Sequence, residues 1–69
     1  MKAIIKWTNK YSNESGYVAD VSAKEKCFHN TFEKGGAKLY ASESSAKKVI
    51  ATLEKYGEGE NNNFEVVAV

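Results

Sequence analysis

The sequence predicts an α+β domain: a mostly antiparallel sheet of four to five strands with one helix packed on one face. Three observations predict it. Short segments rich in β-forming residues lie near both ends of the chain, turn-forming residues separate them, and one helical pattern precedes the final segment. The chain has 69 residues, which favours a single domain spanning residues 1–69. The expected order is β-β-(β)-β-α-β.

Two strands are expected in the first third of the chain. Residues 2–8 gather the β-forming Ile4, Ile5 and Trp7. Residues 9–16 are dense in turn-forming residues and are expected to form a loop. Residues 17–23 alternate between two faces and give the second strand.

The middle of the chain is more ambiguous. Residues 24–26 are a charged connection, and residues 27–32 fit either a third strand or an irregular turn. Gly35 and Gly36 indicate a turn, since paired glycines supply the positive φ angles that a hairpin needs. Residues 37–41 are then expected to form the returning strand.

Residues 42–56 show the strongest helical pattern. Apolar residues recur at helical spacing on one stripe, at Ala46, Val49, Ile50, Leu53 and Tyr56. Ser42 or Ser44 is expected to cap the start, and Gly57 suits the position just after the end. A polar loop over 58–63 and a final strand over 64–69 complete the chain.

Composition excludes several classes of protein. Ten basic residues, all lysine, nearly balance nine acidic ones, whereas strong nucleic-acid binders carry a basic excess and use arginine. The short apolar run near the start lacks the length of a signal peptide or a membrane span. We therefore expect no membrane association and a cytoplasmic location, which the lone cysteine also favours.

No catalytic or metal-binding constellation is recognisable. Cys27 and His29 would share one face of a strand, as a thiolate nucleophile and its base would require. No orienting group or oxyanion donor can be identified for them, and the cysteine and histidine count is too low for a structural zinc site. The chain is therefore expected not to be an enzyme and to carry no cofactor and no metal.

The feature weighted most is apolarity on both faces of the sheet. Ile4 and Ile5 are adjacent and must point to opposite faces, as must Val66 and Val67, whereas one helix covers only one face. Apolar side chains left exposed in this way mark association surfaces, although a loop folding over them is the alternative. The candidate interface residues are Ile4, Trp7, Tyr17, Phe64, Val67 and Val69.

These observations favour a small binding or regulatory protein that acts by protein–protein association, either with itself as a dimer or with a larger target. The final strand, if it lies at an edge, could pair with a strand of the partner. Size and composition fit an accessory protein of a phage or mobile element, for example an inhibitor of a host machine.

Nucleic-acid binding is the alternative function, with Lys47, Lys48 and Lys55 on the helix as candidate contacts. The segment Gly16–Val21 and the Ser-Ala-Lys-Lys start of the helix resemble the arm-type DNA-binding domains of phage integrases and AP2-like modules. The resemblance implies strands followed by a helix and contact with DNA. The missing arginine and the trailing strand depart from that pattern.

Overall fold

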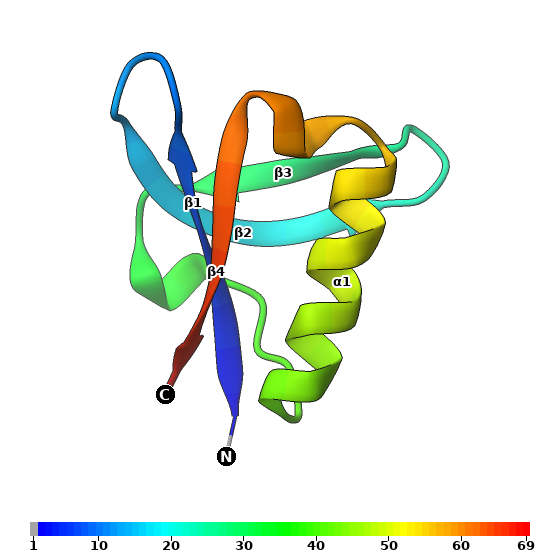
Figure 1. Cartoon of the computed structure of the whole chain (residues 1–69). Helices are drawn as coiled ribbons and strands as arrows, with labels where there is room; N and C mark the ends of the chain where they lie inside the picture. The colour runs from blue at the N-terminus through cyan, green and yellow to red at the C-terminus, as the bar shows by residue number, and fades with distance from the viewer. Residues whose placement is uncertain (1) are drawn as a thin grey trace.

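The computed structural model describes residues 2–69, so that Met1 of the predicted domain lies outside the described residues. It is an α+β fold with one α-helix and a four-stranded antiparallel sheet (Figure 1), which confirms the predicted fold class. Two short 3-10 turns, η1 and η2, flank the helix. The elements in chain order are β1 (Ala3–Asn9), β2 (Ser15–Ser22), β3 (Cys27–Thr31), η1 (Lys34–Gly36), α1 (Glu43–Lys55), η2 (Glu58–Glu60) and β4 (Asn62–Ala68).

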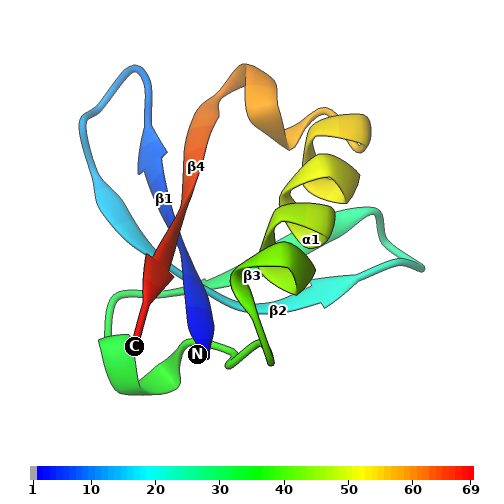
Figure 2. The same cartoon turned by 60° about the horizontal axis from the view of Figure 1, so that its bottom comes forward.

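The strand order in the sheet is β3-β2-β1-β4. β1 pairs with β4 along its whole length, from Ala3 opposite Ala68 to Asn9 opposite Asn62. Its pairing with β2 is confined to residues 6–8, so β2 and β3 turn away and run across β1 and β4 (Figure 1). The sheet is strongly bent as a result, and α1 lies against its inner side (Figure 2).

α1 forms where the sequence predicts it. The Ser42 hydroxyl accepts a hydrogen bond from the Ser45 amide, at 3.2 Å, and so caps the first turn. After the last turn, Gly57 takes a φ of 92°, in the left-handed region that glycine adopts readily. The predicted stripe faces the sheet, with Ala46 and Leu53 fully buried and its other members partly buried against the same core.

The middle of the chain differs from the hairpin that the glycines indicate. β3 is a strand, which settles the ambiguity over residues 27–32. The prediction of positive φ at the glycine pair is wrong: Gly35 and Gly36 both lie in η1, and Gly57 is the only glycine with positive φ in residues 2–69. An ordinary 3-10 turn reverses the chain here without left-handed residues.

The returning strand over residues 37–41 is reduced to a single bridge, between Tyr40 and Ala3. One further backbone hydrogen bond, 3.0 Å long, joins the Lys38 amide to the Val18 carbonyl. The pairing of β1 with β2 ends near this point, at Lys6 opposite Tyr17, and β2 carries an irregularity in its pairing with β3 between Val18 and Asp20. The segment therefore bridges β2 and β1 where they diverge, which leaves it too few partners to form a ladder.

Tyr40 is expected to make the stability of the fold depend on pH. Its side chain is buried, and its hydroxyl has no hydrogen-bond partner among residues 2–69. Burial, with a smaller contribution from the Asp20 carboxylate, raises the pKa of the Tyr40 phenol. The folded state therefore favours the neutral phenol. The stability that this preference contributes is complete below the unfolded pKa of about 10 and is lost as the pH rises through the folded pKa.

We expect Tyr40→Phe to lose less stability above pH 10 than the unsubstituted protein. The substitution should cost little at pH 7, because the hydroxyl it removes makes no hydrogen bond to the described part of the chain. Urea unfolding at pH 7 and at pH 11 measures both effects. Tyr11→Phe is the matched control for the loss of a tyrosine hydroxyl, since Tyr11 is 79% exposed. Identical profiles for Tyr40→Phe and the unsubstituted protein would contradict the prediction.

Candidate functional site

A polar pocket lies beyond the end of α1, between the β1–β2 hairpin, β3 and η2. Its volume is about 340 Å³. Amides and carboxylates predominate in its lining, together with two aromatic rings. The lining residues are Trp7, Asn9, Glu14, Phe28, Asn30, Glu58 and Asn62.

The η2 side of the pocket is held by hydrogen bonds to Lys10, which directly follows β1, and to Asn62 at the start of β4. The Lys10 ammonium donates to the Gly59 carbonyl at 2.8 Å, and the Lys10 amide donates to the Asn61 carbonyl at 2.9 Å. The Asn62 side chain donates to the Glu58 carbonyl at 3.4 Å. These bonds fix the backbone that carries the Glu58 carboxylate.

The hairpin side is held by Asn9. Its side-chain oxygen accepts hydrogen bonds from the amides of Tyr11 and Ser12, both at 2.9 Å. The backbone amide of Asn9 donates to the Glu14 carbonyl at 2.7 Å. An asparagine that bonds the next amides in this way stabilises a tight turn, so the Glu14 backbone is also fixed across the pocket from η2.

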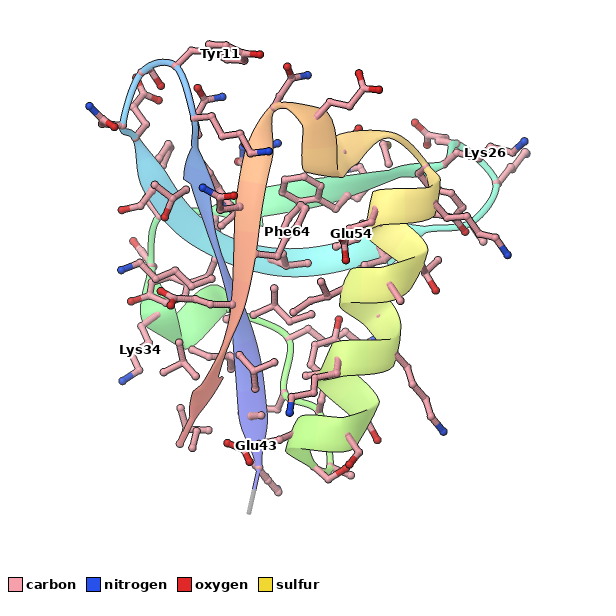
Figure 3. The ribbon with its side chains drawn as sticks, in the orientation of Figure 1. Tyr11, Lys26, Lys34, Glu43, Glu54 and Phe64 are labelled. Atoms are coloured by element: carbon pink, nitrogen blue, oxygen red, sulfur yellow. The ribbon has the colours of Figure 1, made fainter. Side chains whose placement is uncertain are left out.

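Aromatic rings form the apolar part of the pocket. The ring centroids of Trp7 and Phe28 are 6.5 Å apart, and those of Phe28 and Phe64 are 5.4 Å apart in an edge-to-face arrangement. Trp7 is 5% exposed, and its ring lies directly against Gly16, where a Cβ atom would meet it at 2.8 Å. Gly16 thus allows the indole to lie flat across β2. Phe64 projects from β4 toward this cluster (Figure 3).

No lysine is among the described residues that line the pocket. Glu14 and Glu58 are both among its lining residues, and neither forms an ion pair with any of residues 2–69. The ion pairs within residues 2–69 join other residues, Lys6 with Glu65 at 3.9 Å and Lys38 with Asp20 at 3.8 Å. The lining therefore carries an uncompensated negative charge.

The outer edge of β4 is a second candidate site. The Val69 amide donates to the Lys2 carbonyl at 3.0 Å. In an antiparallel pair, hydrogen-bonded and non-hydrogen-bonded residue pairs alternate along the strands, so this bond shows which residues of β4 bond to β1. By this alternation, every second residue of β4 directs its amide and carbonyl away from β1, and no backbone bond from residues 2–69 reaches these groups. The outward-facing residues are Asn62, Phe64, Val66 and Ala68.

The predicted interface residues do not form one surface. Ile4 and Trp7 are 1% and 5% exposed, which corrects the expectation that they offer side chains to a partner; each face of the sheet is packed at these positions. Tyr17, Phe64 and Val67 are partly buried, and Val69 is 48% exposed. Because Ile4 pairs with Val67 and Trp7 pairs with Phe64, the set is divided between the two faces.

The other candidates lie apart from the pocket. Lys47, Lys48 and Lys55 are exposed on α1. Cys27 is partly buried and His29 is exposed on β3, and residues 2–69 hold no group of three or more potential metal ligands of the His, Cys, Asp and Glu types. In the same part of the chain, no helix combines the length and apolarity needed to cross a membrane.

Most of the pocket residues carry no signal in the sequence. Asn9, Glu14, Glu58 and Asn62 stand in segments that read as polar loops, and only the pairing of β1 with β2 and β4 brings them together. Trp7 is the exception: its size singles it out, although its role is in the lining of the pocket and not on the outer surface.

Comparisons with protein-family models, with curated proteins and with solved structures give no match to this chain. The resemblance to arm-type DNA-binding domains therefore gains no support from them. A proposal about function has to be argued from the geometry of the chain.

Proposed function

We propose that this chain is a small non-enzymatic regulatory protein that acts by protein–protein association through the free edge of β4. The observation that carries the proposal is the row of outward-facing backbone groups on β4, which have no partner within residues 2–69. An edge strand of this kind pairs readily with a strand of another chain.

The occupant that fits this edge best is a second copy of the chain, paired antiparallel about Val66. In that register Phe64 lies opposite the Ala68 of the other copy, a large side chain against a small one. Glu65, the only charged residue of β4, lies opposite Val67. The two Glu65 carboxylates are therefore not directly opposite each other. The two copies are related by a two-fold axis, which gives a closed dimer.

The setting that we propose follows from size and composition: a cytoplasmic accessory protein of a phage or mobile element, such as an inhibitor of a host machine. Nucleic-acid binding is the weaker proposal. The exposed Lys47, Lys48 and Lys55 share α1 with the exposed acids Glu43 and Glu54, so the helix carries no strong positive surface.

Ala68→Pro tests the edge directly. The Ala68 amide points away from β1 and its side chain is exposed, so proline removes an outward donor without breaking a bond inside the sheet. We expect light scattering to show a dimer for the unsubstituted protein that persists at high salt, and a monomer for Ala68→Pro at the same concentration.

Ala68→Ser is the matched control, because it retains the backbone donor and should remain a dimer. Circular dichroism confirms that each variant is folded. A monomeric unsubstituted protein, or an Ala68→Pro variant that is folded and still dimeric, would show that β4 does not mediate self-association.

A further inference from the structure

We propose that α1 also takes part in self-association, and that Lys47 of each copy forms an ion pair with Glu54 of the other. This inference rests on the proposed function, since it starts from the antiparallel contact of two β4 edges about Val66. It adds a second contact, which makes the edge selective for another copy of the same chain. Three observations carry it: where α1 lies on the sheet, which flank of α1 faces β4, and the lack of partners for the two charges within residues 2–69.

The position of α1 brings the two helices together in such a dimer. Of the strands, α1 lies nearest to β1 and β4, on the inner side of the sheet (Figure 2). A two-fold axis between paired β4 edges runs perpendicular to the sheet, so both helices lie on the same face. Strands are about 4.8 Å apart, so a helix lying over β1 and β4 is about one strand spacing from the axis. The two helix axes are then about 10 Å apart, close to the spacing of packed helices.

The helix and β4 run in opposite directions over the same span. The bridge between Tyr40 and Ala3 places the start of α1 near the C-terminal end of β4, and η2 connects the end of α1 to Asn62. The 13 residues of α1 and the seven residues of β4 each extend over about 20 Å. Ile50, near the middle of α1, therefore lies within one helical turn of the level of Val66, where the two-fold axis passes.

One flank of α1 faces β4 and, beyond its free edge, the second copy. Glu43 and Glu54 both lie on this side of the helix (Figure 3). Lys47 is four residues after Glu43 and seven before Glu54, which places it on the same flank at 3.6 residues per turn. Ile50, which packs partly buried against the core, lies between Lys47 and Glu54. The flank therefore carries a positive and a negative charge on either side of Ile50.

The two charges have no partner within one copy. Lys47 and Glu54 are exposed, and neither forms an ion pair with any of residues 2–69. Lys47 stands three residues before Ile50 and Glu54 four after it, so antiparallel helices that meet near Ile50 bring each lysine opposite the glutamate of the other copy. The two-fold axis makes this pair twice. A foreign strand could bond to the backbone of β4 but would leave these charges unpaired, so the helices favour an identical chain.

Charge reversal tests the ion pairs. Analytical ultracentrifugation at low salt measures the dissociation constant of the dimer for Lys47→Glu, for Glu54→Lys and for the variant that carries both substitutions. Each single substitution turns two attractive pairs into two repulsive ones and should weaken the dimer about tenfold. The double variant restores opposite charges, so its dissociation constant should return to within about threefold of that of the unsubstituted protein. Salt at about 1 M should reduce the defect of the single variants, because it screens exposed charges.

Lys48→Glu is the matched control, since it makes the same change of charge one residue along α1 and about 100° around it. Its dissociation constant should stay within about twofold of that of the unsubstituted protein, and circular dichroism shows whether each variant is folded.

Three results would overturn the role of α1 while leaving the β4 edge in place: a dimer unaffected by either single reversal, a double variant as weak as the single ones, or an equal loss in Lys48→Glu. An unsubstituted protein that stays monomeric at every concentration would overturn both this inference and the proposed self-association through β4. The two failures are therefore distinguishable in one set of measurements.

Discussion

Leu53→Ala is expected to lower the free energy of unfolding by about 3 kcal/mol. Leu53 is fully buried at the contact between α1 and the sheet, so its truncation leaves a cavity as well as losing apolar burial. A domain of this size has only a few kcal/mol of stability, and the variant should be largely unfolded near its physiological temperature. Urea unfolding followed by circular dichroism measures the change.

Leu39→Ala is the matched control for Leu53→Ala. Leu39 is the other leucine of the chain and is 55% exposed, so the same truncation should cost less than about 0.5 kcal/mol. Equal losses at the two positions would mean that α1 does not bury Leu53 in solution as it does in the structure.

Gly16→Ala is expected to destabilise the protein by about 2 kcal/mol. A Cβ atom at this position would lie 2.8 Å from the Thr31 carbonyl oxygen and 2.8 Å from Cζ2 of Trp7. The carbonyl belongs to β3 and cannot give way without opening the sheet, so the indole must also move. The fluorescence maximum of Trp7 should therefore shift together with the loss of stability.

Gly35→Ala separates the effect of crowding at residue 16 from the general effect of replacing a glycine. Apart from its two neighbours in the chain, no residue that the structure describes comes within 4 Å of a Cβ atom there, and Gly35 does not have positive φ. The variant should be as stable as the unsubstituted protein or slightly more so, because alanine reduces the entropy of the unfolded chain. A loss at Gly35 equal to that at Gly16 would rule out steric crowding as the cause.

Local patterns predict the helix and the strands because each is encoded in neighbouring residues. The stripe through Ala46 and Leu53 predicts α1, and the cap at Ser42 predicts its start. The returning strand at residues 37–41 is less predictable, since a β-forming segment becomes a strand only where a partner lies alongside it. Here the separation of β1 and β2 leaves room for one bridge, at Tyr40.

The candidate sites depend on long-range pairing, which the sequence does not show. The adjacency of Ile4 and Ile5 correctly predicts apolar positions on both faces of the sheet. It does not predict that Ile4, on the opposite face from Ile5, is also buried. Glu14 and Glu58 are 44 positions apart in the chain and line one pocket only because β4 returns beside β1.

The pairing of β1 with β4 also constrains when the protein can fold during its synthesis. β1 lies between β2 and β4. Ile5 of β1 is buried, and Val66 of β4 is its partner in the sheet. Until the residues of β4 leave the ribosome, one side of β1 has no partner and the core is open. The nascent chain should therefore stay sensitive to protease until β4 emerges, and then close in a single late step limited by this distant contact.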